Sequence, residues 1–450
     1  MKKREPVILT EGDIGKQLLM FVWPILLANV FQQVYNITNS MIVGNYMSYE
    51  ALAAVGASTS VINLAHYFFY GVSTAAGILV SHYYGAKDQE NLRKAVETGL
   101  VMAVVVAISL TAFTEIFMSA LLDLSNVTDA LREYTESYLR VYCIGYVAVF
   151  LYNMCFFIMR SLGDSMGPLI YLIMSCVVNI VLGVVFVKFL NWGVVGAALA
   201  TVISQFMVDF FALRSLYAMD EAFRINLAHL HVSGDLVKRM LQLGIPASVQ
   251  NMLIGISAFV VQANINLFPD TAIAGIGVAD KIAVWAQIPM QSISTIGTNY
   301  VGQNLGAKKY DRVQQGIKLC VKIAVIITII TSSGIFLLAE PLVKLFNSNP
   351  EVISYGTSMV KYTVFAFIPL ALSHIYNGCC RGAGNMMIPM IIAVMSQCIF
   401  KYVFVQFGLA INFDIHIIYL SNLLSYTLAG LGATLYFHLS KWTKEAHLRP

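Results

Sequence analysis

Residues 100–110 have the sequence LVMAVVVAISL, an apolar run in which only Ser109 is polar. Polar and apolar residues do not alternate in it, as they would in a strand of a membrane β-barrel, so we predict that it belongs to a helix. Comparable runs recur along all 450 residues, of which 58% are apolar and 12% are charged. Soluble domains carry about 25% charged residues. The composition therefore predicts an integral membrane protein and argues against a soluble enzyme, a disordered chain or a nucleic-acid binder.

Twelve segments are long and apolar enough to span a bilayer as helices of about 20 residues. The six in the first half lie near residues 17–43, 51–83, 95–121, 131–159, 167–190 and 194–217. The six in the second half lie near residues 238–267, 272–302, 314–338, 351–380, 387–409 and 415–440. The first segment is longer than the apolar core of a signal peptide, so we expect it to remain as a spanning helix.

Most lysines and arginines flank one set of the connections between these segments. Examples are Lys87 and Arg93 after the second segment, and Lys308, Lys309 and Arg312 after the eighth. An excess of positive charge marks the cytoplasmic side of a membrane protein. We therefore expect both termini in the cytoplasm and the chain in an inner or plasma membrane.

The two halves of the chain repeat each other at a nearly constant offset. ALAAVGAS at 51–58 recurs 221 residues later as AIAGIGVA at 272–279. RSLGD at 160–164 recurs at the same offset as RGAGN at 381–385, and Gly163 and Gly384 are expected to permit a tight turn in each copy. A register held over more than a hundred residues indicates duplication of one unit.

Each repeat holds an even number of spans, so both copies enter the membrane from the same side, as in transporters built from parallel repeats. We predict an N-terminal six-helix bundle at 17–217 and a C-terminal six-helix bundle at 238–440, which form a V with a central cleft. Residues 1–16, 218–237 and 441–450 are expected to be a cytoplasmic N-terminal segment, linker and tail.

Amide side chains form a stripe on the first predicted helix. Asn29, Gln33, Asn36 and Asn39 are three or four residues apart and share one face. Such a stripe faces a wet cavity or hydrogen-bonds to a partner helix, and both interpretations stay open. The seventh helix repeats the pattern with Gln250 and Asn251. Both helices also contain a proline that permits a bend or hinge, at Pro24 and Pro246.

Asp280 is the most informative acid, because a charge inside a bilayer is expensive. It lies about two turns inside the predicted outer end of the eighth helix, on one face with Gln287, and contact with water at the interface stays open as an alternative. Its possible partners are Lys361, Lys401 and His374. Asp209 in the sixth helix is expected to form an interfacial ion pair. The full set of candidate substrate- or ion-binding residues is Asn29, Gln33, Asn36, Asn39, Asn153, Asn179, Gln250, Asn251, Asp280, Gln287, His374 and Asn377.

The stretches PILLANVFQQVYNITNSMIVGNY at 24–46, ALAAVGAS at 51–58 and GQNLGAKKYDR at 302–312, with the paired turns RSLGD and RGAGN, resemble the multidrug and toxic compound extrusion (MATE) family. The resemblance covers essentially the whole chain. It implies a pair of bundles that export organic cations, drugs or dyes in exchange for inward H⁺ or Na⁺.

The chain departs from that family where coupling acids are expected. Many members have an aspartate at the position of Asn39 on the first helix, and many have another at the position of Gly183 on the fifth. An amide binds Na⁺ or a ligand but does not exchange a proton near pH 7. Asp280 becomes the leading coupling acid by elimination.

We therefore expect a secondary antiporter without a cofactor or a resident metal, although Na⁺ remains a possible coupling ion. Its partners would be a cationic or otherwise amphipathic small molecule, H⁺ or Na⁺ and membrane lipids, and a monomer would suffice.

A flippase for a lipid-linked precursor is the alternative. It would require a basic cavity, whereas the first helix carries amides and no arginine. No nucleophile–base pair or phosphate loop favours an enzyme, and the seven cysteines show no CxxC spacing.

Overall fold

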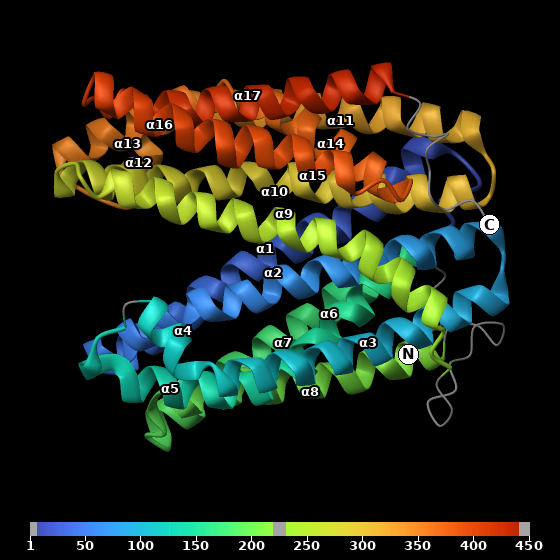
Figure 1. Ribbon diagram of the computed structural model, residues 1–450, viewed down its shortest axis with the longest axis horizontal. Helices are drawn as coiled ribbons and strands as arrows, with labels where there is room; N and C mark the ends of the chain where they lie inside the picture. The colour runs from blue at the N-terminus through green and yellow to red at the C-terminus, as the bar shows by residue number, and fades with distance from the viewer. Residues whose placement is uncertain (1–6, 126, 219–230, 441–450) are drawn as a thin grey trace. The chain divides into compact units, whose positions relative to one another are not determined.

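The computed structural model describes residues 7–125, 127–218 and 231–440 of the chain. Residues 1–6 of the expected N-terminal segment, 219–230 of the expected linker and the whole expected tail, 441–450, lie outside the described residues. Contacts divide the chain into two compact units. Unit 1 comprises Met1–Leu9 and Leu19–Ser248, and unit 2 comprises Thr10–Leu18 and Val249–Pro450. Helices form nearly all of each unit (Figure 1).

The helices of the first half follow the apolar segments of the sequence. They are α1 (Ile14–Tyr46), α2 (Tyr49–Ala86), α3 (Gln89–Ile116), α4 (Met118–Leu124), α5 (Asp129–Ile144), α6 (Tyr146–Ser161), α7 (Met166–Val184), the π-helical turn η1 (Val185–Phe189) and α8 (Gly193–Tyr217). Within unit 1, α8 packs against α5, α6 and α7, and α2 packs against α3, α5 and α6.

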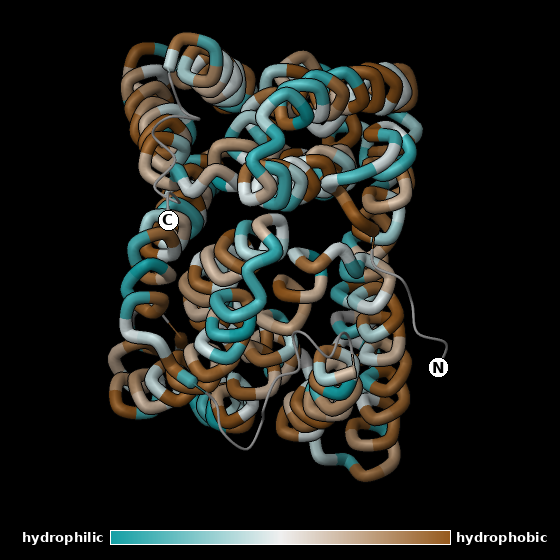
Figure 2. Tube along the Cα trace, turned by 90° about the vertical axis from the view of Figure 1, so that its right-hand side faces the viewer, coloured by the Kyte–Doolittle hydropathy of each residue, from teal (hydrophilic) through white to brown (hydrophobic). Residues whose placement is uncertain are grey.

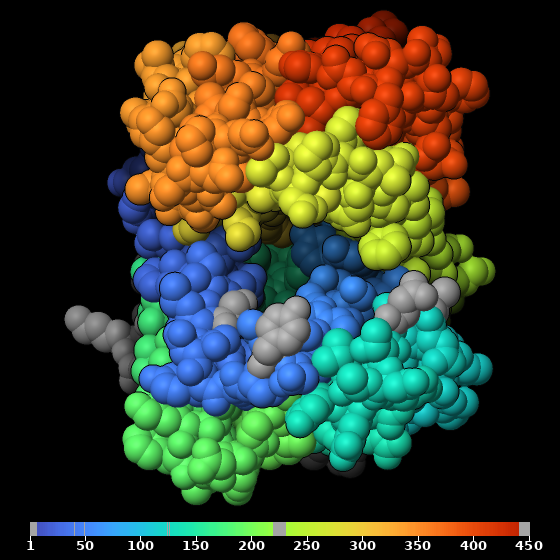
Figure 3. All heavy atoms as spheres, turned by 90° about the vertical axis from the view of Figure 1, so that its left-hand side faces the viewer, coloured from blue at the N-terminus to red at the C-terminus, as the bar shows by residue number. Residues whose placement is uncertain are grey.

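The second half repeats this order. Its elements are α9 (Gly234–Ile265), α10 (Asp270–Gly306), α11 (Tyr310–Leu337), α12 (Ala339–Lys344), α13 (Pro350–Val364), α14 (Phe367–Gly382), α15 (Met387–Ala393), the π-helical stretch η3 (Val394–Phe400), α16 (Lys401–Ile411) and α17 (His416–Leu439). Within unit 2, α10 packs against α11, α13 and α14, and α17 packs against α14 and α16. In Figure 3, α11–α14 (orange) and α15–α17 (red) lie against one another.

The prediction of an all-α membrane protein is confirmed. Ten helices of the described chain are long and apolar enough to cross a bilayer, or up to twelve spans if each of two bent pairs counts as one. The bent pairs are α5 with α6, at 49°, and α13 with α14, at 51°, so the expected segments 131–159 and 351–380 are not straight helices. The chain breaks at Gly145 in the first pair, where an added Cβ would lie 2.2 Å from Cγ2 of Val202 on α8.

The repeated motifs adopt the same local structure in both copies. Lys87 ends α2 with φ 57°, and Lys308, 221 residues later, follows α10 with φ 58°. Gly163 and Gly384 both have positive φ, of 91° and 79°, so the turns expected at these glycines are confirmed. The duplication therefore extends to individual backbone conformations.

Large apolar side chains are exposed along many helices, among them Ile116, Phe210, Phe259, Leu337 and Ile411. In Figure 2 the helices are largely hydrophobic, while several turns at their ends are hydrophilic. Exposed apolar side chains of this size are expected on a surface that faces lipid. Such side chains are consistent with helices that cross a bilayer.

Two helices belong to both units. The start of α1, up to Leu18, groups with unit 2, and the start of α9, up to Ser248, groups with unit 1. In unit 1, Oγ of Ser248 donates to the carbonyl of Phe68 at 2.6 Å, and an added Cβ on Gly71 of α2 would lie 2.5 Å from the carbonyl oxygen of Gly244. Backbone-to-backbone contact of this kind needs glycine.

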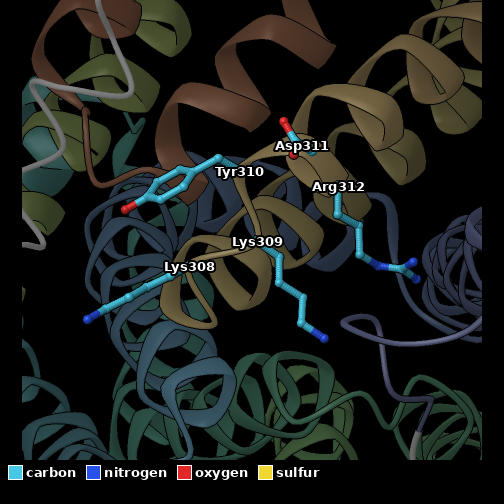
Figure 4. Close-up of a pocket in the computed structure, with 5 residues that line it drawn as sticks. All are labelled: Lys308, Lys309, Tyr310, Asp311 and Arg312. Carbon is cyan, nitrogen blue, oxygen red and sulfur yellow. The ribbon is translucent and has the colours of Figure 1, made fainter.

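In unit 2, Arg312 at the start of α11 holds the segment that leads into α1. Its guanidinium donates to the carbonyls of Gly12 and Glu11 and to Oε1 of Gln17, each at 2.8 Å. Lys309 donates to the carbonyl of Thr10 at 3.0 Å. Figure 4 shows these two side chains beside the open pocket at the α10–α11 turn, with Lys308 pointing away from Arg312. Lys309 and Arg312 thus have a structural role.

Candidate functional site

The amide stripe of α1 lies in unit 1. Asn29, Gln33 and Asn39 are half-buried, and Asn36 is exposed. One turn before Asn39, the buried hydroxyl of Tyr35 lies near Asn39 and near Thr201 of α8, without a well-formed hydrogen bond. Near Tyr35 and Asn39, the polar face of α1 therefore lies close to Thr201 of α8. That the rest of the stripe faces a wet cavity stays a prediction.

A row of buried polar side chains runs along one face of α8. Thr201, Gln205 and Asp209 are spaced at four residues, so they lie one above another on one side of the helix. Nδ2 of Asn179 on α7 donates to Oγ1 of Thr201 at 3.1 Å, and Nε2 of Gln205 donates to Oγ of Ser175 on α7 at 3.3 Å. We call these five residues the α8 polar row. Asn179 was predicted from the sequence, but Ser175 and Thr201 were not; the four-residue spacing from Asn179 on α7 points to Ser175, and that from Gln205 on α8 points to Thr201.

Asp209 lies at the far end of the α8 polar row from Asn179. Its residue surface is 3% exposed, and neither carboxylate oxygen has a hydrogen-bond partner in the described chain. The expectation of an interfacial ion pair is therefore wrong. The reason is helical geometry: Arg214, the nearest basic residue along α8, follows five positions later, about 140° around the helix, and its side chain is exposed.

The acid of unit 2 has a different environment. Asp280 on α10 is exposed, and of the three proposed partners Lys401, the first residue of α16, lies within electrostatic range of it without forming a direct ion pair. Tyr426 of α17 is also within electrostatic range of the carboxylate. The other two side chains lie near other groups: the ammonium of Lys361 lies 5.9 Å from the ring centre of Phe336, and the imidazole of His374 lies within electrostatic range of Arg381.

The remaining candidates lie on α6, α9, α10 and α14. Gln250, Asn251 and Gln287 are half-buried in unit 2. Nδ2 of Asn153 donates to the carbonyl of Val149 at 2.7 Å, and Nδ2 of Asn377 donates to Oγ of Ser373 at 3.2 Å, so both side chains bond within their own helices.

Farther along α9, amides act as interhelical contacts. Nε2 of Gln406 on α16 donates to Oδ1 of Asn264 on α9 at 3.1 Å. The bond from Nε2 of Gln262 to Oδ1 of Asn266, at 2.8 Å, instead joins two residues at the end of α9 itself. Amides that join helices in this way stabilise packing within a membrane.

Pro24 and Pro246 are buried inside α1 and α9, which continue through them. Their role as bends or hinges stays a prediction.

Among the described residues, no three His, Cys, Asp or Glu side chains are grouped so that they could hold a metal ion.

Comparison with known proteins decides the family. The MatE sequence model matches residues 24–185 and 246–406, one match in each repeat. The chain belongs to the MatE family. The resemblance inferred from the sequence motifs is thereby confirmed, and so is the expectation that the chain is a membrane transporter and not an enzyme.

Two curated relatives come from Bacillus subtilis. The chain is 26% identical over 403 residues to the protein named "Probable multidrug resistance protein YoeA", with 87% of each chain covered. It is 24% identical over 445 residues to "Probable multidrug resistance protein YpnP", with 96% of this chain and 97% of the relative covered.

Solved structures show the same fold. An outward-facing multidrug resistance MATE family transporter of the MOP superfamily matches with a TM-score of 0.90 at 20% identity, over 98% of both chains. A MOP superfamily transporter from Pyrococcus furiosus, whose structure is described as having a binding pocket of reverse polarity, matches with a TM-score of 0.89 at 20% identity, again over 98% of both chains. The chain is thus a multi-pass membrane transporter of this fold.

Proposed function

We propose that this MatE-family protein is a secondary active antiporter that exports organic cations, drugs or other amphipathic small molecules in exchange for H⁺ or Na⁺. The observation that carries the proposal is the family match in both repeats, at residues 24–185 and 246–406. The names of the curated relatives, which refer to multidrug resistance and multidrug export, support the substrate class.

Alternating access fits a duplicated fold. A transporter of this kind exposes its site to one side of the membrane and then to the other, and an ion gradient shifts the population between the two states. Pro24 and Pro246 are the proposed bends that accompany this change. The excess of basic residues on one set of connections supports a plasma-membrane location with both termini in the cytoplasm. A monomer suffices for this cycle.

Asp280 is the proposed site of competition between substrate and coupling ion. An exposed carboxylate attracts an organic cation, and a proton or Na⁺ on the same group removes that attraction. Lys401 lies within electrostatic range of Asp280 and opposes the binding of any other cation there. Substrate and coupling ion would therefore displace one another, which is what an exchanger requires.

Inverted membrane vesicles loaded with this protein test the function directly. We expect a fluorescent organic cation such as ethidium to accumulate when a pH gradient or a sodium gradient is imposed separately, and we expect Asp280→Asn to abolish the accumulation. Accumulation under neither gradient would contradict the antiporter and favour the flippase. Unchanged pH-driven transport by Asp280→Asn would remove Asp280 from the coupling site.

A further inference from the structure

We propose that Asp209 is a second proton-carrying group of this transporter, enclosed within unit 1 and separate from Asp280 in unit 2. The inference rests on the proposed antiport. Its basis is the position of an acid at the end of the α8 polar row, where the described part of the chain provides neither a counter-charge nor a hydrogen-bond donor.

The burial of Asp209 is nearly complete. Its residue surface is 3% exposed, and both carboxylate oxygens are enclosed without a hydrogen-bond partner among residues 7–125, 127–218 and 231–440. An ionised carboxylate in such a place costs several kcal/mol. The described conformation therefore favours the uncharged acid, which must bind a proton on entering this state and lose it when the environment becomes more polar.

Titratable groups around Asp209 do not compensate its charge. From α6, Tyr152 and Cys155 lie within electrostatic range, and both are neutral in their ordinary forms. Arg160, also on α6, acts on Tyr152 and Tyr70. No titratable side chain on the other described elements packed against α8 affects the charge of Asp209. These side chains include His66 and Tyr70 of α2, Tyr138 and Tyr142 of α5, Cys176 of α7 and Lys188 of η1.

The rest of the α8 polar row gives the proton a polar surrounding. Two buried amide oxygens of the row have no hydrogen-bond donor in the described chain. They are Oε1 of Gln205, one turn from Asp209, and Oδ1 of Asn179, further along the row. Acceptors of this kind stabilise hydroxyl groups and water that carry protons. The row ends at Thr201, beside Tyr35 and the amide stripe of α1. Asp209 is therefore connected by polar groups to the helix that carries the candidate substrate-binding amides.

The decisive experiment combines a spectroscopic and a transport measurement on the purified full-length protein in liposomes. Infrared difference spectroscopy detects the carbonyl stretch of a protonated carboxylic acid, which an ionised carboxylate lacks. We expect this band at about pH 7 in the wild type and in the matched control Asp311→Asn, which changes an exposed acid at the start of α11. We expect its Asp209 component to be absent in Asp209→Asn and to shift in frequency in Asp209→Glu.

The transport arm uses ethidium accumulation driven by a pH gradient. Asp209→Asn is expected to accumulate no more ethidium than empty liposomes, and Asp209→Glu to retain accumulation with an altered pH profile. An unchanged carbonyl band in Asp209→Asn would overturn the proposal, and so would an unchanged pH profile of transport in that variant. If the wild type transports under no gradient, the proposed function fails, while the spectrum still reports whether Asp209 binds a proton. Because Asp209→Glu keeps the acid, it also separates a loss of the proton site from a loss of folding.

Discussion

The two units share the same order of helices but differ in the polar chemistry that these helices carry. The positions of Asn179, Gln205 and Asp209 in unit 1 correspond, 221 residues later, to Phe400, Tyr426 and Gly430 in unit 2. Three members of the α8 polar row are thus replaced by two aromatic side chains and a glycine, while Ser175 and Thr201 correspond to the buried polar residues Ser396 and Asn422. Duplication preserved the scaffold, while the acid and the amides of the row were lost or gained in only one of the two units.

The acid of unit 2 lies on a different helix. Asp280 on α10 corresponds to Thr59 in unit 1, and its neighbour Lys401 corresponds to Ile180. One unit therefore encloses a carboxyl group without a partner, and the other exposes one within range of an ammonium group. The comparison indicates two acids with distinct tasks, which the following substitutions test in order of decreasing effect.

The largest effect is expected from Gly430→Ala, at the position that corresponds to Asp209. An added Cβ on Gly430 would lie 2.3 Å from the carbonyl oxygen of Pro369, so α14 and α17 would have to separate. We expect a loss of about 3 kcal/mol or more of stability, as overpacking of a close contact produces. Thermal unfolding in detergent measures it. Gly277→Ala, on α10 with no atom within 4 Å of its added Cβ, is the control that should remain stable; equal melting of both variants would refute the close contact.

A smaller effect is expected at Arg312, which has no basic counterpart in unit 1, where Asn91 occupies its position. Arg312→Ala removes the donors to Gly12, Glu11 and Gln17. Hydrogen bonds from charged groups contribute about 1.5–3 kcal/mol when buried and less at this partly exposed site. We expect limited proteolysis to cleave the segment before α1 several times faster than in the wild type. Lys322→Ala, an exposed residue of α11, is the control, and identical cleavage rates in both variants would show that Arg312 does not anchor this segment.

A still smaller effect is expected from changing Lys401, which acts on Asp280 in unit 2. Lys401→Gln removes the positive charge that acts on Asp280, so organic cations should bind about fivefold more tightly, which corresponds to about 1 kcal/mol in a partly solvated site. Isothermal titration with ethidium measures the change. Lys361→Gln, which alters a lysine above Phe336, should leave the affinity unchanged. If the Lys401 effect persists in a background of Asp280→Asn, the two residues do not act on each other.

The smallest effect is expected at Ser175 in the α8 polar row. Ser175→Ala removes the acceptor for Gln205 at 3.3 Å and should cost about 1 kcal/mol or less, as interhelical hydrogen bonds in membranes do. The corresponding Ser396 in unit 2 donates to the carbonyl of Ile392 in its own helix, so Ser396→Ala should cost less still. Chemical unfolding of the two variants side by side provides the comparison. A greater loss for Ser396→Ala would argue against a stabilising row in unit 1.

The sequence predicted the fold well because hydropathy and the 221-residue repeat are properties of the chain itself. The turns at Gly163 and Gly384 were predictable for the same reason, since only glycine readily takes positive φ there. The breaks within the fourth and tenth spans were not, because the close approach of Gly145 to Val202 joins residues far apart in the chain.

The candidate site was predicted less completely. Asp280 and its possible partners were identified from their position in apolar segments, but only the folded chain, which brings Lys401 within electrostatic range of Asp280, distinguishes it from Lys361 and His374. Asp209 was expected near the interface because Arg214 follows it closely in sequence. Its true environment depends on how α8 is rotated against α6 and α7, which hydropathy does not report.

Proton release on substrate binding tests the central claim, that cation export is coupled to one acid in each unit. Purified protein in weakly buffered detergent solution is mixed with ethidium, and a pH indicator records the protons released. The account predicts release from the wild type, less from Asp209→Asn and from Asp280→Asn, and none from the double variant. Equal release from the wild type and the double variant, or none from the wild type, would contradict it.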